Sequence, residues 1–151
     1  MVSISTSQFS SLSLDEMYDI LRIRATVFVL EQGVVYIDPD GNDKNAVQIY
    51  AYVDGVMVGC LRIYQLDEGT YRIGRVAVLK EFRGKRIGNA MMNAAIKYLR
   101  EHTDATRVCL DAQLHAIRFY EKLGFVLFTE EFLEEGILHR GMQMFLERKA
   151  Q

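Results

Sequence analysis

The chain has 151 residues, half of them hydrophobic and a quarter charged, a composition that fits one globular domain over residues 1–151. Eighteen basic and twenty acidic residues give a net charge of −2, which excludes a globally basic nucleic-acid-binding protein. No apolar run approaches the roughly 18 residues that a transmembrane helix needs, so we expect no membrane partner. Cys60 and Cys109 lie in apolar segments, which predicts buried free thiols and a reducing, cytoplasmic location.

The N-terminal third predicts a short strand, a helix and a loop. Residues Ile4–Phe9 fit an edge strand. Ser13 and Glu16 then have the spacing of a capping box, and apolar residues at helical spacing follow as far as Gly33, where we expect the helix to end. Proline, glycine and aspartate in residues 38–43 indicate a loop.

The rest of the chain predicts a meander of strands followed by alternating helices and strands. Apolar residues alternate in three segments joined by glycine turns, Val47–Val53, Val56–Tyr64 and Tyr71–Leu79. A helical apolar repeat runs from Ile87 to Leu99. The later elements are a strand at Arg107–Ala112, a helix at Ala116–Leu123 and strands at Phe125–Phe128 and Arg140–Leu146. This order predicts an α/β fold with a mixed, mostly antiparallel twisted sheet flanked by helices.

The turn that opens the long helix is typical of a phosphate site. Gly84 and Gly88 let a ligand approach the backbone, and the first amides of a helix have no partner within it. A diphosphate suits this positive end of the helix dipole. The same turn carries four basic residues, Lys80, Arg83, Lys85 and Arg86. Its spacing fits neither a P-loop nor a dinucleotide fingerprint, and a solvated basic helix start is the other interpretation.

Several motifs in this chain resemble one enzyme family. The pattern Arg83-x-x-Arg86-x-Gly88 is similar to motif A of the GNAT superfamily of N-acetyltransferases, and the run from Gln113 to Phe125 is similar to motif B. A closer resemblance, to the ElaA-like (YjcF-like) acetyltransferases, covers the chain from about residue 15 to 146. It rests on five segments in the same order, Arg24–Gly33, Asp38–Asp43, Ile73–Val76, Ala112–Gln113 and Glu135–His139.

The resemblance implies the acyl-CoA N-acyltransferase (GNAT) fold, with acetyl-CoA as co-substrate and no metal. In that fold the strand that here carries Val76, Ala77 and Val78 leaves its neighbour at a bulge and pairs with the pantetheine arm. A backbone N–H of this strand polarises the thioester carbonyl. The amides of the glycine turn hold the pyrophosphate. The cofactor-binding residues implied in this way are Val76, Ala77, Val78, Arg83, Gly84, Lys85, Arg86, Ile87, Gly88, Asn89 and Gln113.

Three residues are candidates for proton transfer. The resemblance implies that Tyr120 protonates the leaving thiolate, whereas the residue taken alone would be a core aromatic. His139 is the first candidate for the base because histidine titrates near neutrality, although a lone histidine is more often a surface or capping residue. Glu31 is the second, since a glutamate needs burial to raise its pKa for this task.

Two acidic segments bear on the acceptor. The spacing of Asp38, Asp40 and Asp43 does not fit a calcium loop, and we interpret them as a polar loop that rims the acceptor site and favours a cationic amine. The second segment contains Glu130, Glu131, Glu134 and Glu135. It is either a solvated face or a surface that attracts an amine substrate.

Together these observations predict an N-acetyltransferase. Acetyl would pass from acetyl-CoA to a primary amine by direct attack in a ternary complex, since no nucleophile–base pair is evident. The acceptor is a small-molecule amine or a peptide or protein amine, and a homodimer is left open. The alternatives are an acyl-CoA-binding regulatory module without catalysis and a protein-interaction domain that binds no CoA.

Overall fold

Seven strands form one sheet in the computed structural model, which describes residues 1–147; residues 148–151 of the predicted domain lie outside this range. The strands are β1 (Val2–Gln8), β2 (Val47–Val53), β3 (Val56–Asp67), β4 (Thr70–Val78), β5 (Arg107–Gln113), β6 (Val126–Glu134) and β7 (Ile137–Phe145). Their order is β1-β2-β3-β4-β5-β7-β6, and only the β4–β5 pair is parallel. The mixed, mostly antiparallel sheet is therefore confirmed, with β1 as an edge strand.

Three α-helices flank the sheet, α1 (Leu14–Arg24), α2 (Ile87–His102) and α3 (Ile117–Lys122). The predicted capping box is present, since Ser13 and Glu16 exchange hydrogen bonds at the start of α1. The helix continues beyond α1 as a π-helical segment, Ala25–Glu31, a change of winding that apolar spacing does not reveal. Within residues 1–147, no helix combines the length and the hydropathy needed to cross a membrane.

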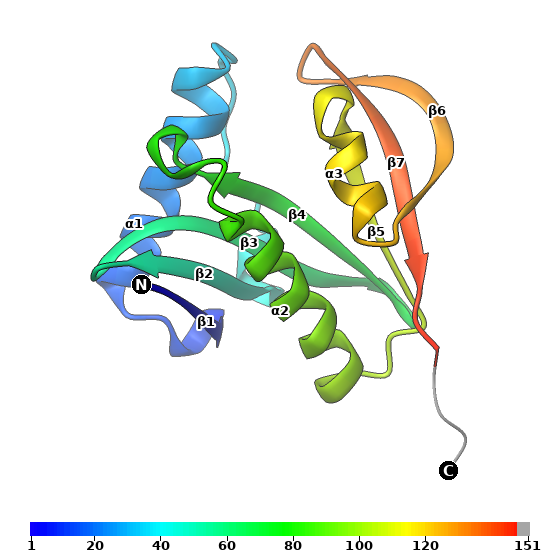
Figure 1. The fold of residues 1–151 in the computed structure, drawn as a ribbon, viewed down its shortest axis with the longest axis horizontal. Coiled ribbons are helices and arrows are strands. Elements are labelled where there is room, and N and C mark those ends of the chain that lie inside the picture. The colour runs from blue at the N-terminus through cyan, green and yellow to red at the C-terminus, as the bar shows by residue number, and fades with distance from the viewer. Residues whose placement is uncertain (148–151) are drawn as a thin grey trace.

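The alternation of the strands gives the sheet a hydrophobic core on each face. Ile49 and Ala51 of β2 belong to the larger core, which α2 covers, whereas Tyr50 between them belongs to a smaller core under α1. Figure 1 shows α2 and α1 on opposite sides of the sheet, with α3 beside β5. The long helix is therefore anchored along one face by apolar contacts that leave its N-terminal turn at the surface.

A bulge and a splay in β4 open the sheet. Cys60 pairs with Ala77 and Arg62 with Gly74, so β4 has one extra residue between these partners. Arg75 lies in the bulge with a φ of +50°, a left-handed conformation that is unusual for a residue with a side chain. The parallel pairing of β4 with β5 is recorded only over Thr70–Arg72, and the two strands diverge beyond it (Figure 1).

The C-terminal hairpin is longer than the sequence predicts. Strand β6 extends to Glu134 and β7 begins at Ile137, so the hairpin turns at Glu135 and Gly136, both with positive φ. The run of glutamates concealed this strand because charged residues are rare in a strand with a buried face. His139 therefore lies inside β7, where it pairs with Phe132 of β6 and Gln113 of β5.

Candidate active site

Two adjoining cavities lie where β4 and β5 diverge. The larger, of about 880 Å³, is bounded by the π-helical segment, β4, β5 and the β6–β7 hairpin; we call it the acceptor cleft. The smaller, of about 440 Å³, lies between the end of β4, the turn before α2 and α3; we call it the turn cavity. Both are lined by Val76, Val78, Arg83, Ala116 and Tyr120, so the two spaces meet along these residues.

The turn cavity collects most of the predicted cofactor-binding residues, Val76, Val78, Arg83, Gly84, Arg86, Ile87, Gly88 and Asn89. Arg86 caps α2 in a left-handed conformation with a φ of +62°, and Gly84 has a φ of +78°. Lys85 lines neither cavity, and its ammonium group lies 5.4 Å from the centre of the Phe82 ring. The turn thus exposes the start of α2 to the cavity, with Lys85 outside it.

Gly88 has a packing role that its sequence context did not indicate. A Cβ atom at this position would lie 3.3 Å from Cζ of Phe119 on α3. The absence of a side chain therefore lets α2 and α3 approach each other. The approach of a ligand to Gly88 stays a prediction, and the residue lines the turn cavity. Phe119 and Ala116 themselves line the turn cavity and were not singled out from the sequence.

Glu31 and Arg83 form an ion pair in the lining of the acceptor cleft, and Arg83 also lines the turn cavity. The guanidinium donates to both carboxylate oxygens, at 2.6 and 2.8 Å, and Nε donates to the carbonyl of Val78 at 2.9 Å. The hydrogen bond from Arg83 lowers the pKa of Glu31. A general base needs the opposite shift, so this environment does not favour Glu31 in that role.

Tyr120 is buried, with 8% of its surface exposed, and lines both cavities. Its ring packs edge-on against Phe119 and Phe125. Within residues 1–147 its hydroxyl has no hydrogen-bond partner. Burial raises the pKa of Tyr120, so the phenol is protonated at neutral pH and is a weaker acid than an exposed tyrosine.

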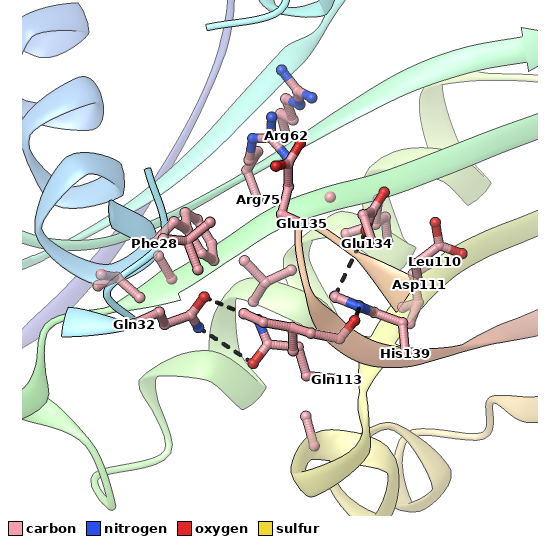
Figure 2. A pocket seen from close by; sticks show the side chains of 18 of the residues that line it. Phe28, Gln32, Arg62, Arg75, Leu110, Asp111, Gln113, Glu134, Glu135 and His139 are labelled. Carbon is pink, nitrogen blue, oxygen red and sulfur yellow. Dashed lines mark hydrogen bonds and ion pairs between the residues drawn. The ribbon is translucent and has the colours of Figure 1, made fainter. Parts of the chain in front are cut away.

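His139 lies in the acceptor cleft with 7% of its surface exposed. Its Nδ1 is 2.7 Å from the carbonyl oxygen of Ile137, which can only accept, so Nδ1 carries the proton in the neutral ring. Nε2 is then the unprotonated nitrogen, 3.6 Å from a carboxylate oxygen of Glu134 (Figure 2). This tautomer leaves a basic lone pair at Nε2.

Gln113 lies in the acceptor cleft rather than in the turn cavity, so its predicted contact with the cofactor is not supported by the lining of the turn cavity. Its side-chain amide and that of Gln32 face each other with N–O distances of 3.3 Å (Figure 2). Gln32 belongs to the segment that follows the π-helix and was not singled out from the sequence. The pair joins the first helical segment to β5 across the cleft.

The aspartate loop is a buried ionic cluster rather than an open acidic rim, which corrects the prediction. Arg24, 1% exposed, donates to Asp38 at 2.8 Å and to both oxygens of Asp43 at 2.6 and 3.1 Å. Buried charges need such partners, because desolvation is otherwise prohibitive. These two carboxylates are therefore neutralised inside the protein and do not face an amine.

The same cluster reaches the bulge in β4. Arg62 donates to both oxygens of Asp40 at 2.8 and 2.7 Å, and this interaction holds the pKa of Asp40 well below its usual range. Arg75 forms an ion pair with Asp38 at 3.0 Å and donates to the Asp38 carbonyl at 3.0 Å. Asp40 is the one aspartate of the loop that lines the acceptor cleft. The loop thus holds the side chain of the bulged residue.

The two cysteines are buried free thiols, as predicted. Burial raises the pKa of Cys60 to about 12, and it also raises that of Cys109. Both therefore remain protonated and are poor nucleophiles at neutral pH. Within residues 1–147, no group of three His, Cys, Asp or Glu side chains is arranged to hold a metal ion.

Known proteins are similar to this chain in sequence and in fold. The profile of the acetyltransferase (GNAT) family matches residues 14–125. The chain belongs to this family. It is 35% identical to protein ElaA of Escherichia coli K12 over 137 residues, which cover 88% of this chain and 90% of ElaA. The resemblance to ElaA-like acetyltransferases is thereby confirmed.

Solved structures agree with this assignment. The crystal structure of E. coli ElaA matches with a TM-score of 0.88 and 33% identity, over 95% of this chain and 99% of that one. An acyl-CoA N-acyltransferase from Pseudomonas aeruginosa gives the same values. The fold is therefore that of the acyl-CoA N-acyltransferases, enzymes that use an acyl-CoA and an amine.

Proposed function

We propose that the protein is an N-acetyltransferase that moves acetyl from acetyl-CoA to a primary amine by direct attack. The observation that carries the proposal is the position of Tyr120, which lines both the turn cavity and the acceptor cleft and whose hydroxyl has no hydrogen-bond partner within residues 1–147. A hydroxyl that faces a cavity and has no partner in the protein is free to bind a ligand. The two substrates would meet at this point.

The lining of the turn cavity suits acetyl-CoA. Val76, Val78 and Phe119 offer apolar surface to the pantetheine arm, and the amides at the start of α2 face the same space with Arg83 and Arg86 beside them. We assign the pyrophosphate to this turn, since helix N-termini with free amides bind such anions. The edge of β4 at Val76, Ala77 and Val78, which diverges from β5, would pair with the amide groups of the arm.

The proposed reaction replaces the C–S bond of the thioester with a C–N bond and includes two proton transfers. The amine nitrogen attacks the thioester carbonyl carbon, the new C–N bond forms, and the C–S bond breaks. His139 Nε2 accepts the proton that the nitrogen loses, and Tyr120 gives its proton to the departing sulfur. Tyr120 regains a proton from solvent, and His139 returns one to solvent past the half-exposed Glu134.

His139 is preferred to Glu31 as the base for reasons of geometry. The ring is fixed by its bond to the Ile137 carbonyl, and Nε2 lies 3.6 Å from a carboxylate oxygen of Glu134. Glu31 is already committed to Arg83. We assign Glu31 to holding the arginine that lies between the two cavities.

The setting and assembly of the enzyme remain predictions. Cys60 and Cys109 are buried free thiols, which supports a location in the reducing cytoplasm. Small-molecule amines and peptide or protein amines both stay open as acceptor types, and so does a homodimer.

A thiol-release assay with acetyl-CoA and a panel of primary amines tests the function. We expect CoA to appear only when an acceptor amine is added, at a rate that falls about 10²-fold in Tyr120→Phe, as general-acid catalysis allows. Calorimetry with CoA runs in parallel. Binding of CoA without release of thiol for any amine would indicate the regulatory module instead, and absence of CoA binding would indicate an interaction domain.

A further inference from the structure

The charges in the acceptor cleft are balanced except at the tip of the β6–β7 hairpin. Every arginine that lines the cleft has a carboxylate partner: Arg62 with Asp40, Arg72 with Asp111, Arg75 with Asp38, and Arg83 with Glu31. Two further carboxylates line the cleft, those of Glu134 and Glu135. Within residues 1–147, neither has an arginine or lysine partner. The hairpin tip therefore contributes negative charge that the protein does not neutralise.

The two glutamates point to different parts of the cleft. Glu134 lies 3.6 Å from Nε2 of His139, where it serves the base. Glu135 is the turn residue, and Figure 2 shows its carboxylate on the side of Arg62 and Arg75, away from His139. Since those arginines are committed to Asp40 and Asp38, Glu135 is left as the one lining carboxylate of the described chain without a basic partner.

Other features of the cleft indicate a ligand with a particular chemistry. Tyr120, a residue with 8% of its surface exposed whose hydroxyl has no partner within residues 1–147, and Nε2 of His139 mark the place of the reacting nitrogen. That nitrogen is neutral when it attacks, so it needs no permanent counter-charge. Val27, Phe28 and Ile37 contribute apolar side chains to the lining of the cleft, which suits a chain of methylene groups.

On the basis of the proposed function, we propose that the acceptor is a diamine or polyamine. Its reacting nitrogen lies between Tyr120 and His139, its methylene chain lies along the apolar side chains of the lining, and its second ammonium group pairs with Glu135. Glu135 is thus a specificity-determining residue that acts on a charge remote from the reacting nitrogen. On this account the unpaired negative charge of the cleft binds the cationic end of the substrate.

Three amines with the same four-carbon spacing test the proposal, n-butylamine, 1,4-diaminobutane and 4-aminobutanoate. They differ only in the remote end, which is neutral, positive or negative. We expect kcat/KM for the diamine to exceed that for butylamine by about tenfold after correction for its two equivalent nitrogens, as suits a partly solvated charge pair near 4 Å. The aminobutanoate should be the poorest of the three, and added salt should narrow the differences.

Variants at the hairpin make the test specific. Glu135→Gln should abolish the advantage in kcat/KM of the diamine over butylamine. Glu130→Gln, an exposed residue of the same hairpin outside the cleft, is the matched control and should leave the preference intact. An equal loss for all three amines in Glu135→Gln, or a parent enzyme indifferent to the remote charge, would overturn the proposal.

A binding measurement separates this inference from the proposed function. Calorimetry of the three amines against the CoA-saturated protein needs no turnover. If no amine is acetylated, the proposed function fails, while a diamine that still binds more tightly than butylamine, and loses that advantage in Glu135→Gln, supports the charge assignment. Equal binding of all three amines would contradict it.

Discussion

Tyr120 belongs both to the core and to the candidate site. Its ring packs against Phe119 and Phe125, and the residue lines both cavities. Tyr120→Phe removes the hydroxyl and keeps the ring. We expect turnover to fall about 10²-fold with the affinity for CoA unchanged, since the hydroxyl acts on the leaving sulfur in the transition state. Steady-state kinetics and calorimetry measure the two quantities. Equal turnover in variant and parent would return Tyr120 to a purely structural role.

His139 is testable through the pH dependence that a base imposes. His139→Ala should lower kcat strongly and change the acid side of the pH–rate profile, because the group that must be deprotonated is gone. Glu31→Gln is the comparison, since Glu31 pairs with Arg83 and its pKa is lowered. It should leave the shape of the profile unchanged. A profile unaffected by His139→Ala, with chemistry rate-limiting, would exclude His139 as the base.

At the scale of elements, the bulge in β4 depends on contacts that no short motif contains. Arg75 and Asp38 are 37 residues apart in the chain and meet only because the loop folds against β4. Motifs in the sequence locate Tyr120 and the turn before α2, since those features are local. They do not reveal the cluster of Arg24, Arg62 and Arg75, because each partner comes from a different element.

Variants of Arg75 can separate the backbone strain at the bulge from the anchoring of the bulge by the ion pair with Asp38. Arg75 has a φ of +50°, which costs about 1–2 kcal/mol for a residue with a side chain and nothing for glycine. Arg75→Ala should therefore be less stable than Arg75→Gly. Both should lose turnover to a similar extent, because both lose the ion pair with Asp38 that positions the bulge. Thermal unfolding and kcat measure these effects, and parent-like turnover in Arg75→Gly would show that the anchor is dispensable.

The contact between α2 and α3 gives a second prediction at this scale. A side chain at Gly88 would meet Phe119, so Gly88→Val should lower the free energy of unfolding by about 1–3 kcal/mol, the usual cost of overpacking. Phe119→Leu should recover part of that loss in the double variant, although it is destabilising on its own. Denaturant unfolding of the four proteins completes the cycle. Additive losses would show that the two positions do not interact.

For the whole molecule, the ionic cluster links stability to pH. The pKa of Asp40 is lowered from its ordinary value of 3.8, chiefly by the hydrogen bonds from Arg62. The unfolded chain therefore takes up this proton before the folded chain does. The stabilisation present above about pH 5 begins to be lost near pH 4, and the loss continues as the pH falls toward the lower pKa of the folded state. In Asp40→Asn the free energy of unfolding should decline less steeply below pH 4 than in the parent. Asp104→Asn, in an exposed loop, is the control and should decline as the parent does. Parallel curves for Asp40→Asn and the parent would contradict the role of the pair.

The overall architecture was predictable to a large extent because its signals are periodic. The alternation of apolar residues in Val47–Val53 predicts a strand of the meander, and the helical apolar repeat from Ile87 predicts the long helix. The extension of β6 to Glu134 was missed because glutamates are rare in strands, whereas this strand is held by its pairing with β7. This hairpin carries His139, Glu134 and Glu135, so the missed strand is also the part of the site that sequence reasoning described least well.

A single-turnover experiment tests the central claim most directly. Enzyme in excess over acetyl-CoA is mixed with 1,4-diaminobutane, and the samples are quenched and analysed for free CoA and N-acetylated amine by mass spectrometry. Direct transfer in a ternary complex predicts that both products appear at the same rate and in equal amounts, with no acetyl on the protein. Release of CoA ahead of the acetylated amine, or CoA bound with no product formed, would contradict the account.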